Sequence, residues 1–247
     1  MYSFLLKMKR IISLGAAMLV ASFFIVIEAQ TLPSPYSVEN GKVIIAQADK
    51  VISDAPIDRL YFKTLLWFIE RQQISEETQL PLVEIGRDFD NHRVEVAIQF
   101  QNKDNQLIYK CLLSVKLAEN SISILASKIT AESTVNVIKL VKRTSFDKLQ
   151  PDKKPKHKEY LDEFSSLYQE YVQQMMGYIN SHPMPIVNHM ADMINGRLVK
   201  GMTKEECTLT MMRMPRSCQL QGETLKLMFD SSTYVFIENG VVTNIIR

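Results

Sequence analysis

Apolar and polar residues alternate along a segment in the first half of the chain. The apolar positions of residues 92–101 are Val94, Val96, Ile98 and Phe100. Residues 80–88, 106–117 and 121–130 also read as strands, and polar pairs such as Glu119-Asn120 separate them. A period of two is typical of a strand with one buried and one solvated face, and Asn favours turns. We therefore expect an antiparallel meander of four strands.

Amphipathic helices are expected on either side of this meander. Residues 57–72 carry apolar side chains at helical spacing after Pro56, which suits the first helical position. A second helical pattern runs on to about Asn180. A further strand is expected over residues 42–50, where β-branched residues follow a turn. Trp67, in the first helix, is expected to lie in the core.

The segment between the meander and the second helix is rich in charge. Its basic residues are Lys142, Arg143, Lys148, Lys153, Lys154, Lys156 and Lys158. Pro151 and Pro155 lie among them, and a charged run with prolines is typical of a solvated linker. Residues 142–158 are therefore predicted to be a linker. A basic patch that contacts anionic surfaces is the alternative.

Residues 36–180 together are predicted to form one α+β module. Its expected order is strand, helix, four strands, helix, with the helices on one face of an antiparallel sheet. The other face is expected to be open to solvent or to a partner.

A smaller module is expected to follow over residues 185–247. A helix over 185–195 should stop at Gly196. Three short strands are predicted over residues 223–230, 232–238 and 241–246. Asn239-Gly240 joins the last two, and this hairpin turn requires a positive φ at Gly240. The module is thus predicted to contain two helices and three strands.

The second helix of this module has a complete start signal. Thr203 is a suitable cap, and Glu206, three residues later, can close a capping box. Met202 and Cys207 occupy the two positions of a hydrophobic staple. This arrangement gives Cys207 a structural reason to be buried.

The first thirty residues determine the expected location of the protein. Basic residues precede an uncharged apolar run from Ile11 to Ile27, and Ala29 supplies a small residue before a cleavage site. This succession is typical of a secretory signal peptide. Residues 1–29 are therefore predicted to be removed from a periplasmic or secreted protein. A retained N-terminal membrane anchor is the alternative.

Charge excludes one class of partner for the mature chain. The full sequence has 29 Lys and Arg against 27 Asp and Glu, and removal of residues 1–29 leaves 26 of each. A neutral protein lacks the basic surplus that neutralises phosphates. Nucleic acid is therefore not expected as a partner, and membrane contact is expected only through an uncleaved N-terminal segment.

Three cysteines leave at least one thiol unpaired in an oxidising compartment. Cys111 lies in the apolar phase of a predicted strand and is expected to be a buried core thiol. Cys207 and Cys218 can form a disulfide or remain two unpaired small apolar residues, because sequence alone does not supply the geometry.

No recognised catalytic or cofactor motif occurs in the sequence. It contains no glycine-rich phosphate loop, no nucleophile elbow, no paired-cysteine redox motif and no His-Glu-x-x-His. A zinc pair of His182 and His189 lacks further spaced ligands. Asp88 and Asp90 are expected in a turn and not in a catalytic carboxylate pair. No cofactor and no metal are therefore expected.

Methionine is concentrated in the last third of the chain. The residues are Met175, Met176, Met184, Met190, Met193, Met202, Met211, Met212, Met214 and Met228. Thioethers are ligands for cuprous copper, but they also fill irregular gaps in a core. Since most of these residues fall on apolar helical faces, packing is the main prediction and copper binding the alternative.

The first module resembles a family of exported bacterial proteins defined as a domain of unknown function with a TATA-binding-protein-like (TBP-like) fold. The resemblance rests on residues 39–44, Glu-Asn-Gly-Lys-Val-Ile, and on residues 65–68, Leu-Leu-Trp-Phe. It implies a TBP-like fold and does not imply DNA binding.

The second module is similar to the SmpA/OmlA (BamE) outer-membrane assembly lipoproteins and to β-lactamase-inhibitory-protein-like domains. The matching segments are residues 198–206 and residues 234–242. Arg213 replaces a glycine that the family usually has before Pro215, and no lipid-bearing cysteine is present. The resemblance implies a protein-binding role without chemistry.

These observations favour an exported, non-enzymatic binding or envelope-assembly protein whose partner is another envelope protein. The small second module and the outward face of the meander are the candidate surfaces, and the residues expected on that face are Arg93, Glu95, Gln99, Lys110, Ser114 and Lys116. An envelope hydrolase is the alternative, and it would require His, Asp and Ser or Cys to converge in one cleft.

Overall fold

The computed structural model describes residues 36–39, 42–44, 47–51, 55–77, 83–101, 107–135, 140–151 and 153–247. Residues 36 to 247 belong to one compact unit. The predicted signal peptide, its cleavage site and the alternative anchor lie outside the described residues. No helix within the described ranges has the length and hydropathy needed to cross a membrane.

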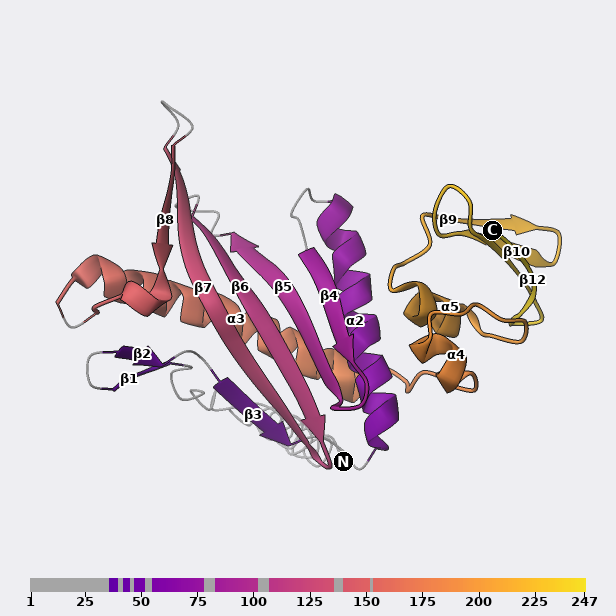
Figure 1. Cartoon of the computed structure of the whole chain (residues 1–247), viewed down its shortest axis with the longest axis horizontal. Coiled ribbons are helices and arrows are strands. Elements are labelled where there is room, and N and C mark those ends of the chain that lie inside the picture. Colours follow the sequence, from indigo (N-terminus) through magenta and orange to yellow (C-terminus); the bar gives the residue numbers. More distant parts are fainter. Residues whose placement is uncertain are drawn as a thin grey trace, which may run out of the picture. The chain divides into compact units, whose positions relative to one another are not determined.

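A large antiparallel sheet forms the first part of this unit (Figure 1). Its strands are β3 (Gln47–Val51), β4 (Val83–Asp88), β5 (Arg93–Gln101), β6 (Leu107–Ala118), β7 (Ser121–Val135) and β8 (Leu140–Ser145). The order is β3-β7-β6-β5-β4, and β8 also pairs with β7. β1 (Ser37–Glu39) and β2 (Lys42–Ile44) form a separate two-stranded hairpin. The strand predicted over residues 42–50 is thus divided between β2 and β3.

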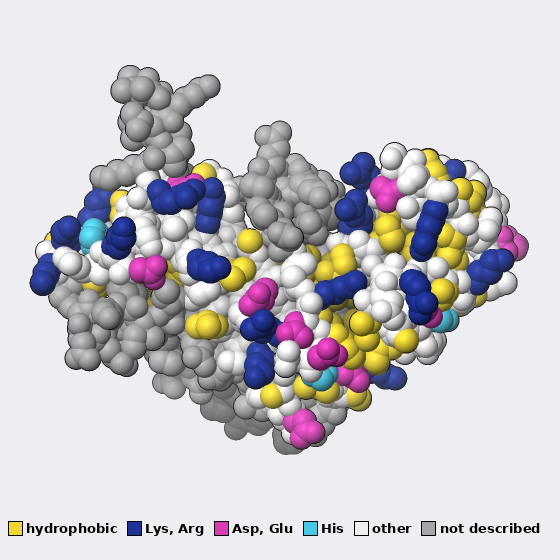
Figure 2. All heavy atoms as spheres, viewed as in Figure 1, with side chains coloured by type: hydrophobic (Ala, Val, Ile, Leu, Met, Phe, Trp, Pro, Cys, Tyr) yellow, Lys and Arg dark blue, Asp and Glu magenta, His cyan; other side chains and the backbone are white. Residues whose placement is uncertain are grey.

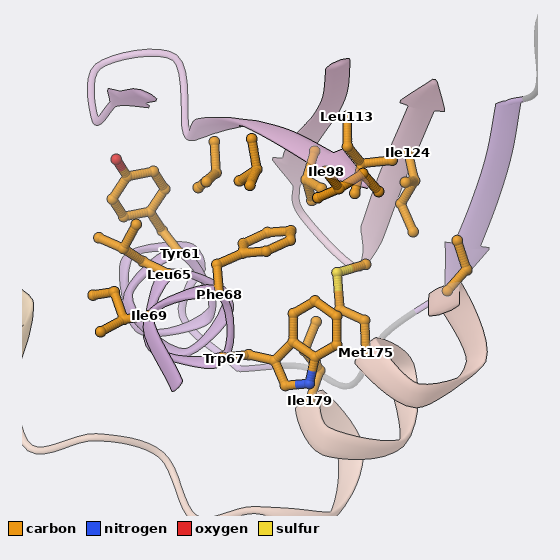
Figure 3. Close-up of a cluster of buried hydrophobic side chains, with 14 of the residues drawn as sticks. Tyr61, Leu65, Trp67, Phe68, Ile69, Ile98, Leu113, Ile124, Met175 and Ile179 are labelled. Atoms are coloured by element: carbon orange, nitrogen blue, oxygen red, sulfur yellow. The ribbon is translucent and has the colours of Figure 1, made fainter. Parts of the chain in front are cut away.

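Two helices, α2 (Ile57–Glu77) and α3 (Pro155–Ser181), pack against one face of this sheet. Phe68 of α2 and Met175 of α3 lie against Ile98, Leu113 and Ile124 of the strands (Figure 3). The strand residues come from three neighbouring strands and are fully or almost fully buried. The apolar residues of the alternation along 92–101 are therefore buried against the helices, as the sequence predicts.

The aromatic residues of the two helices complete this core. Trp67 is 2% exposed, and its ring makes an edge contact with Tyr171 of α3 at 4.9 Å between centroids. Tyr168 of α3 donates a hydrogen bond to the carbonyl oxygen of Ile124 at 3.0 Å. The prediction that Trp67 belongs to the core is confirmed.

A bulge in β7 changes which residues face the core. Ala126 and Ile129 are both buried, while Ser127 and Lys128 between them are both directed away from the core. Lys128 has a φ of 52°, and the pairing of β6 with β7 shifts register at this point. A bulge inserts one extra residue and reverses the phase of a strand. β7 continues to Val135, beyond the predicted end at residue 130, because residues 130–135 pair with β8.

The predicted linker over residues 142–158 is wrong. β8, the short 3-10 helix η1 (Phe146–Lys148) and the start of α3 occupy this segment. Phe146 is 1% exposed and makes ring contacts with Tyr109 and Phe164. The five lysines from Lys148 to Lys158 are exposed, whereas two apolar residues, Phe146 and Leu149, hold the segment on the core. The meander consequently contains five strands, β4 to β8, in place of the four expected.

The last part of the chain contains α4 (Met190–Ile194), α5 (Lys204–Met211) and a four-stranded antiparallel sheet. Its strands are β9 (Ser217–Gln221), β10 (Thr224–Met228), β11 (Tyr234–Glu238) and β12 (Val241–Ile246). The predicted three-strand unit is therefore corrected to four strands. β9 was missed because its residues are nearly all exposed and show no buried alternation.

The first helix of this region is shorter than predicted. α4 begins at Met190 and not near residue 185, because the backbone amides of Asn188 and His189 bind the carboxylate of Glu206 and leave the helical path. The turns have the predicted backbone, since Gly196 has a φ of 67° and Gly240 a φ of 81°.

The predicted start of α5 is present in full. The Thr203 hydroxyl accepts a hydrogen bond from the Glu206 backbone amide, and the Glu206 carboxylate accepts one from the Thr203 amide at 2.9 Å. Met202 and Cys207, the two staple positions, are 0% exposed. Cys207 and Cys218 are both free thiols, and Cys218 is exposed on β9. The two cysteines do not form a disulfide.

A buried lysine holds the C-terminal end of α3. Lys63 of α2 is 2% exposed, and its Nζ donates to the carbonyl oxygen of Ile179 at 2.6 Å and to that of His182. Burial lowers the pKa of this ammonium group. A cation at this position satisfies carbonyls that have no partner within the helix and complements the negative pole of the helix dipole.

Candidate binding surface

The six residues expected on the outward face form three cross-strand pairs of β5 and β6. Arg93 lies opposite Lys116, Glu95 opposite Ser114, and Gln99 opposite Lys110. Their neighbours along each strand, including Val94 and Val115, are buried against the helices. The structure thus places all six on the face that α2 and α3 do not cover, which we call the open face.

The next strand, β7, adds residues that the sequence did not single out. Ser123 pairs with Lys116, and Leu125 pairs with Ser114. Leu125 is 41% exposed, so an apolar side chain lies in a row of polar ones. The signal for it was available, because Leu125 falls between Ile124 and Ala126 in the outward phase of the strand.

A buried carboxylate is the strongest electrostatic feature of the open face. Glu132 of β7 is 7% exposed. One oxygen is 2.7 Å from Lys110 Nζ, and the other is 2.6 Å from Arg143 Nη2 and accepts from Arg143 Nε at 2.6 Å. Burial alone would raise the pKa of Glu132, but the hydrogen bonds from both cations outweigh it and the pKa is lowered. This network fixes Lys110 in place on the surface.

The pairs at the other end of the face are looser. Arg93 Nη2 is 4.0 Å from Asp88 and 3.7 Å from Glu95, and its side chain is well exposed. Asp88 accepts hydrogen bonds from the amide and side chain of Asn91, which lower its pKa. The prediction of a turn at Asp88 and Asp90 is confirmed.

A cavity of about 350 Å³ opens where the bulge of β7 meets β6. Its lining includes Ala97, Gln99, Lys110, Leu112 and Lys128. The lining therefore combines apolar side chains with an amide and two ammonium groups. Such a combination suits an apolar group that carries an acidic or polar tip.

The histidines of the described chain are held in structural contacts. His92 Nε2 is 2.8 Å from Asp58 Oδ1, and His189 Nδ1 is 3.2 Å from the Glu206 carboxylate. Ser181 Oγ is 3.2 Å from His182 Nδ1 but also donates to the Gly177 carbonyl at 2.7 Å. That hydroxyl proton is engaged by the helix backbone, so the pair does not resemble an activated nucleophile.

No group of three or more His, Cys, Asp or Glu within the described ranges is arranged to hold a metal ion. Most of the C-terminal methionines take part in packing. The fully or almost fully buried ones are Met175, Met176, Met193 and Met202, and those that pack against the core are Met184, Met190, Met211, Met212 and Met214.

The small C-terminal sheet presents a second candidate surface. Lys226 of β10 extends over the ring of Tyr234 at 4.7 Å and that of Phe236 at 5.9 Å. Ile246 pairs with Tyr234 across β11 and β12 and is 48% exposed. The outer face of this sheet therefore groups one cation with two aromatic rings, and the polar residues Gln219 and Asn244 lie opposite Lys226 and Phe236.

No protein-family model and no curated protein sequence matches this chain. Two solved structures are similar to part of it. One is a TBP-like protein from Parabacteroides distasonis ATCC 8503, with a TM-score of 0.48, 12% identity, and coverage of 60% of this chain and 99% of that chain. The other is a DUF4468 family protein from Bacteroides ovatus ATCC 8483, with a TM-score of 0.47, 10% identity, and coverage of 65% and 98%.

Proposed function

We propose that the chain is an exported, non-enzymatic protein that binds another protein of the cell envelope through its open face. The observation that carries this proposal is the arrangement around Glu132. A carboxylate held by Lys110 and Arg143 lies beside a cavity on a sheet face that neither helix covers. Polar groups fixed beside apolar area are what a specific partner recognises.

The composition of the open face favours a protein partner over a polyanion. Its cations include Arg93, Lys110 and Lys116, but Glu95 and Glu132 lie among them. Interspersed charges of both signs do not attract a uniformly negative ligand, whereas they can pair with complementary charges of a protein. Leu125, on β7, supplies exposed apolar area on the same face.

The finer fold assignments belong to the same proposal. A TBP-like fold for residues 36–180 is supported by the antiparallel sheet with two helices on one face. An SmpA/OmlA-like fold for residues 185–247 is supported by the capped helix α5 and by the closing hairpin of β11 and β12. The fourth strand, β9, departs from the three-strand unit of that family.

Charge reversal on the open face tests the proposed binding surface. We expect Arg93→Glu combined with Lys116→Glu to abolish capture of the partner from envelope extracts and to fail to rescue a deletion strain. Both side chains are exposed, so folding should be retained. Lys200→Glu combined with Arg213→Glu is a matched control on exposed residues elsewhere. Full rescue by the Arg93 and Lys116 variant would contradict the proposal.

Export is tested separately. N-terminal sequencing of protein from a periplasmic fraction should give a chain that begins at Gln30, because Ala29 precedes the expected cleavage site. Recovery of an intact N-terminus in the membrane would instead support the anchor.

A further inference from the structure

The segment that begins α3 carries a dense group of exposed cations. We call this group the basic end of α3, and its residues are Lys148, Lys153, Lys154, Lys156 and Lys158. Over residues 143–158 the sequence contains only two acidic residues, Asp147 and Asp152. Lys and Arg side chains gather over this end of α3 in the space-filling view (Figure 2).

The local backbone fixes Lys153 and Lys154 in the turn that leads into α3. The amides of Lys153 and Lys154 bind the Gln150 carbonyl at 3.1 and 3.0 Å, and the Gln150 amide donates to His157 Nδ1 at 2.9 Å. His157 accepts at this nitrogen and is therefore uncharged there; burial and the neighbouring Lys154 lower its pKa. The cations are thus held on a folded surface and are not spread along a flexible linker.

These cations do not serve the stability of the helix. The first turn of α3 contains no acidic residue, and Lys154 at the cap position makes no side-chain cap hydrogen bond. Positive charge at the positive pole of a helix dipole is unfavourable. Lys156 lies over the ring of Tyr160 at 5.8 Å, but no such contact is found for Lys154 or Lys158 among the described residues. A sequence that breaks a local rule in this way is expected at functional sites.

The chain enters the described unit beside this patch. Tyr36 is the first described residue, and its hydroxyl donates to Asp162 of α3 at 2.6 Å, one turn beyond Lys158. Residues 28–35 separate Tyr36 from the apolar run that ends at Ile27. A segment of this length spans at most about 30 Å. Where the apolar run is retained as an anchor, the alternative to cleavage after Ala29, the bilayer that holds it is therefore within reach of the basic end of α3; after cleavage the exposed lysines alone provide the contact.

We infer that the basic end of α3 binds the anionic headgroups of a phospholipid bilayer. Lysine ammonium groups attract headgroup phosphates, and each lysine near an anionic surface strengthens membrane binding independently of any specific fit. This contact is separate from the open face, so the protein can lie on a bilayer while it binds its protein partner.

Vesicle sedimentation tests this inference on the protein as it is isolated from cells. The readout is the ratio of the partition coefficients for vesicles with about 30% phosphatidylglycerol and for pure phosphatidylcholine vesicles. An anchor contributes equally to both vesicle types, so the ratio isolates the headgroup contribution. We expect a ratio of at least about 10 in 0.1 M salt, which falls toward unity near 0.5 M because salt screens the attraction.

Two matched variants locate the contact. Lys154→Gln, Lys156→Gln and Lys158→Gln together should lower the ratio at least about tenfold. Lys200→Gln, Arg213→Gln and Arg216→Gln remove three exposed cations elsewhere and should leave the ratio within about twofold of the unmodified protein. Equal binding by the first variant and the unmodified protein would overturn the inference. An equal loss in both variants would also overturn it, since any cation would then suffice.

Discussion

The two ends of α3 use the same residue type in opposite ways. At the C-terminal end, Lys63 is buried and its ammonium group binds the carbonyls of Ile179 and His182. At the N-terminal end, Lys154, Lys156 and Lys158 are exposed and lie at the pole that repels them. The first arrangement stabilises the helix, and the second destabilises it. Lys156 still contacts the ring of Tyr160, whereas the ammonium groups of Lys154 and Lys158 are available for a partner.

The N-terminus of α5 shows the usual arrangement for comparison. There the Glu206 carboxylate is 0% exposed and accepts backbone amides from Thr203, Asn188 and His189. An anion therefore lies at the positive pole of α5, where α3 has lysines. The C-terminal end of α3 and the N-terminal end of α5 thus carry charges that stabilise their helices, whereas the N-terminal end of α3 does not.

The largest effect is expected from loss of the buried lysine. Lys63→Met should lower the free energy of unfolding by about 3 kcal/mol, because the buried carbonyl of Ile179 and the partly buried carbonyl of His182 lose a charged donor. Urea denaturation measures this change. Arg59→Met, at an exposed position on the same helix, should change it by less than about 0.5 kcal/mol. Equal stability of the Lys63 variant and the unmodified protein would remove the contrast between the two ends.

A smaller effect is expected at the start of α5. Glu206→Gln should lower the free energy of unfolding by about 2 kcal/mol at pH 7, because the amide accepts these hydrogen bonds less strongly than the carboxylate. Burial tends to raise the pKa of Glu206, but the backbone hydrogen bonds outweigh it and the pKa is lowered.

The pH dependence checks the sign of this effect. A carboxyl with a lowered folded pKa contributes stability above its ordinary pKa of 4.5 and loses it as the pH falls through the folded value. The difference in the free energy of unfolding between the unmodified protein and the Glu206 variant should therefore become smaller between pH 7 and about pH 3. Glu205→Gln, at the exposed neighbouring position, is the control. A difference in the free energy of unfolding that does not change with pH would refute the role given to this carboxylate.

The smallest effect is a gain in stability. Lys154→Gln, Lys156→Gln and Lys158→Gln together should raise the melting temperature by about 2 °C, because they remove charge from the positive pole while helix propensity is kept. Calorimetry at low salt measures it, and the Lys200, Arg213 and Arg216 variant serves as the control. A fall in melting temperature would show that these lysines do support the helix.

The sequence predicted the features that depend on residues close together in the chain. Thr203 and Glu206 are three residues apart, and the capping box needs no knowledge of the rest of the chain. Val94 and Val96 indicated a half-buried strand because the alternation itself records the burial. The outward pairs, such as Arg93 with Lys116, followed from the same alternation once the strands were in register.

The sequence did not predict contacts between segments that are distant in the chain. Phe146 is buried only because β8 pairs with β7 and brings it against Tyr109 and Phe164. The charged residues and prolines around it predict a linker, because the sequence does not show this pairing. Glu132 became part of the open face through the bulge at Lys128, which reverses the phase of β7. Its partners Lys110 and Arg143 come from two other strands. No short-range pattern specifies such a network.

Site-specific photo-crosslinking in intact cells tests the central claim, protein binding by the open face, most directly. A photoreactive residue in place of Gln99, on the open face, should give one protein adduct that Arg93→Glu combined with Lys116→Glu abolishes. The same residue in place of Gln173, exposed on α3, is the matched control and should give no such adduct. No adduct at Gln99, or the same adduct at both positions, would contradict the claim.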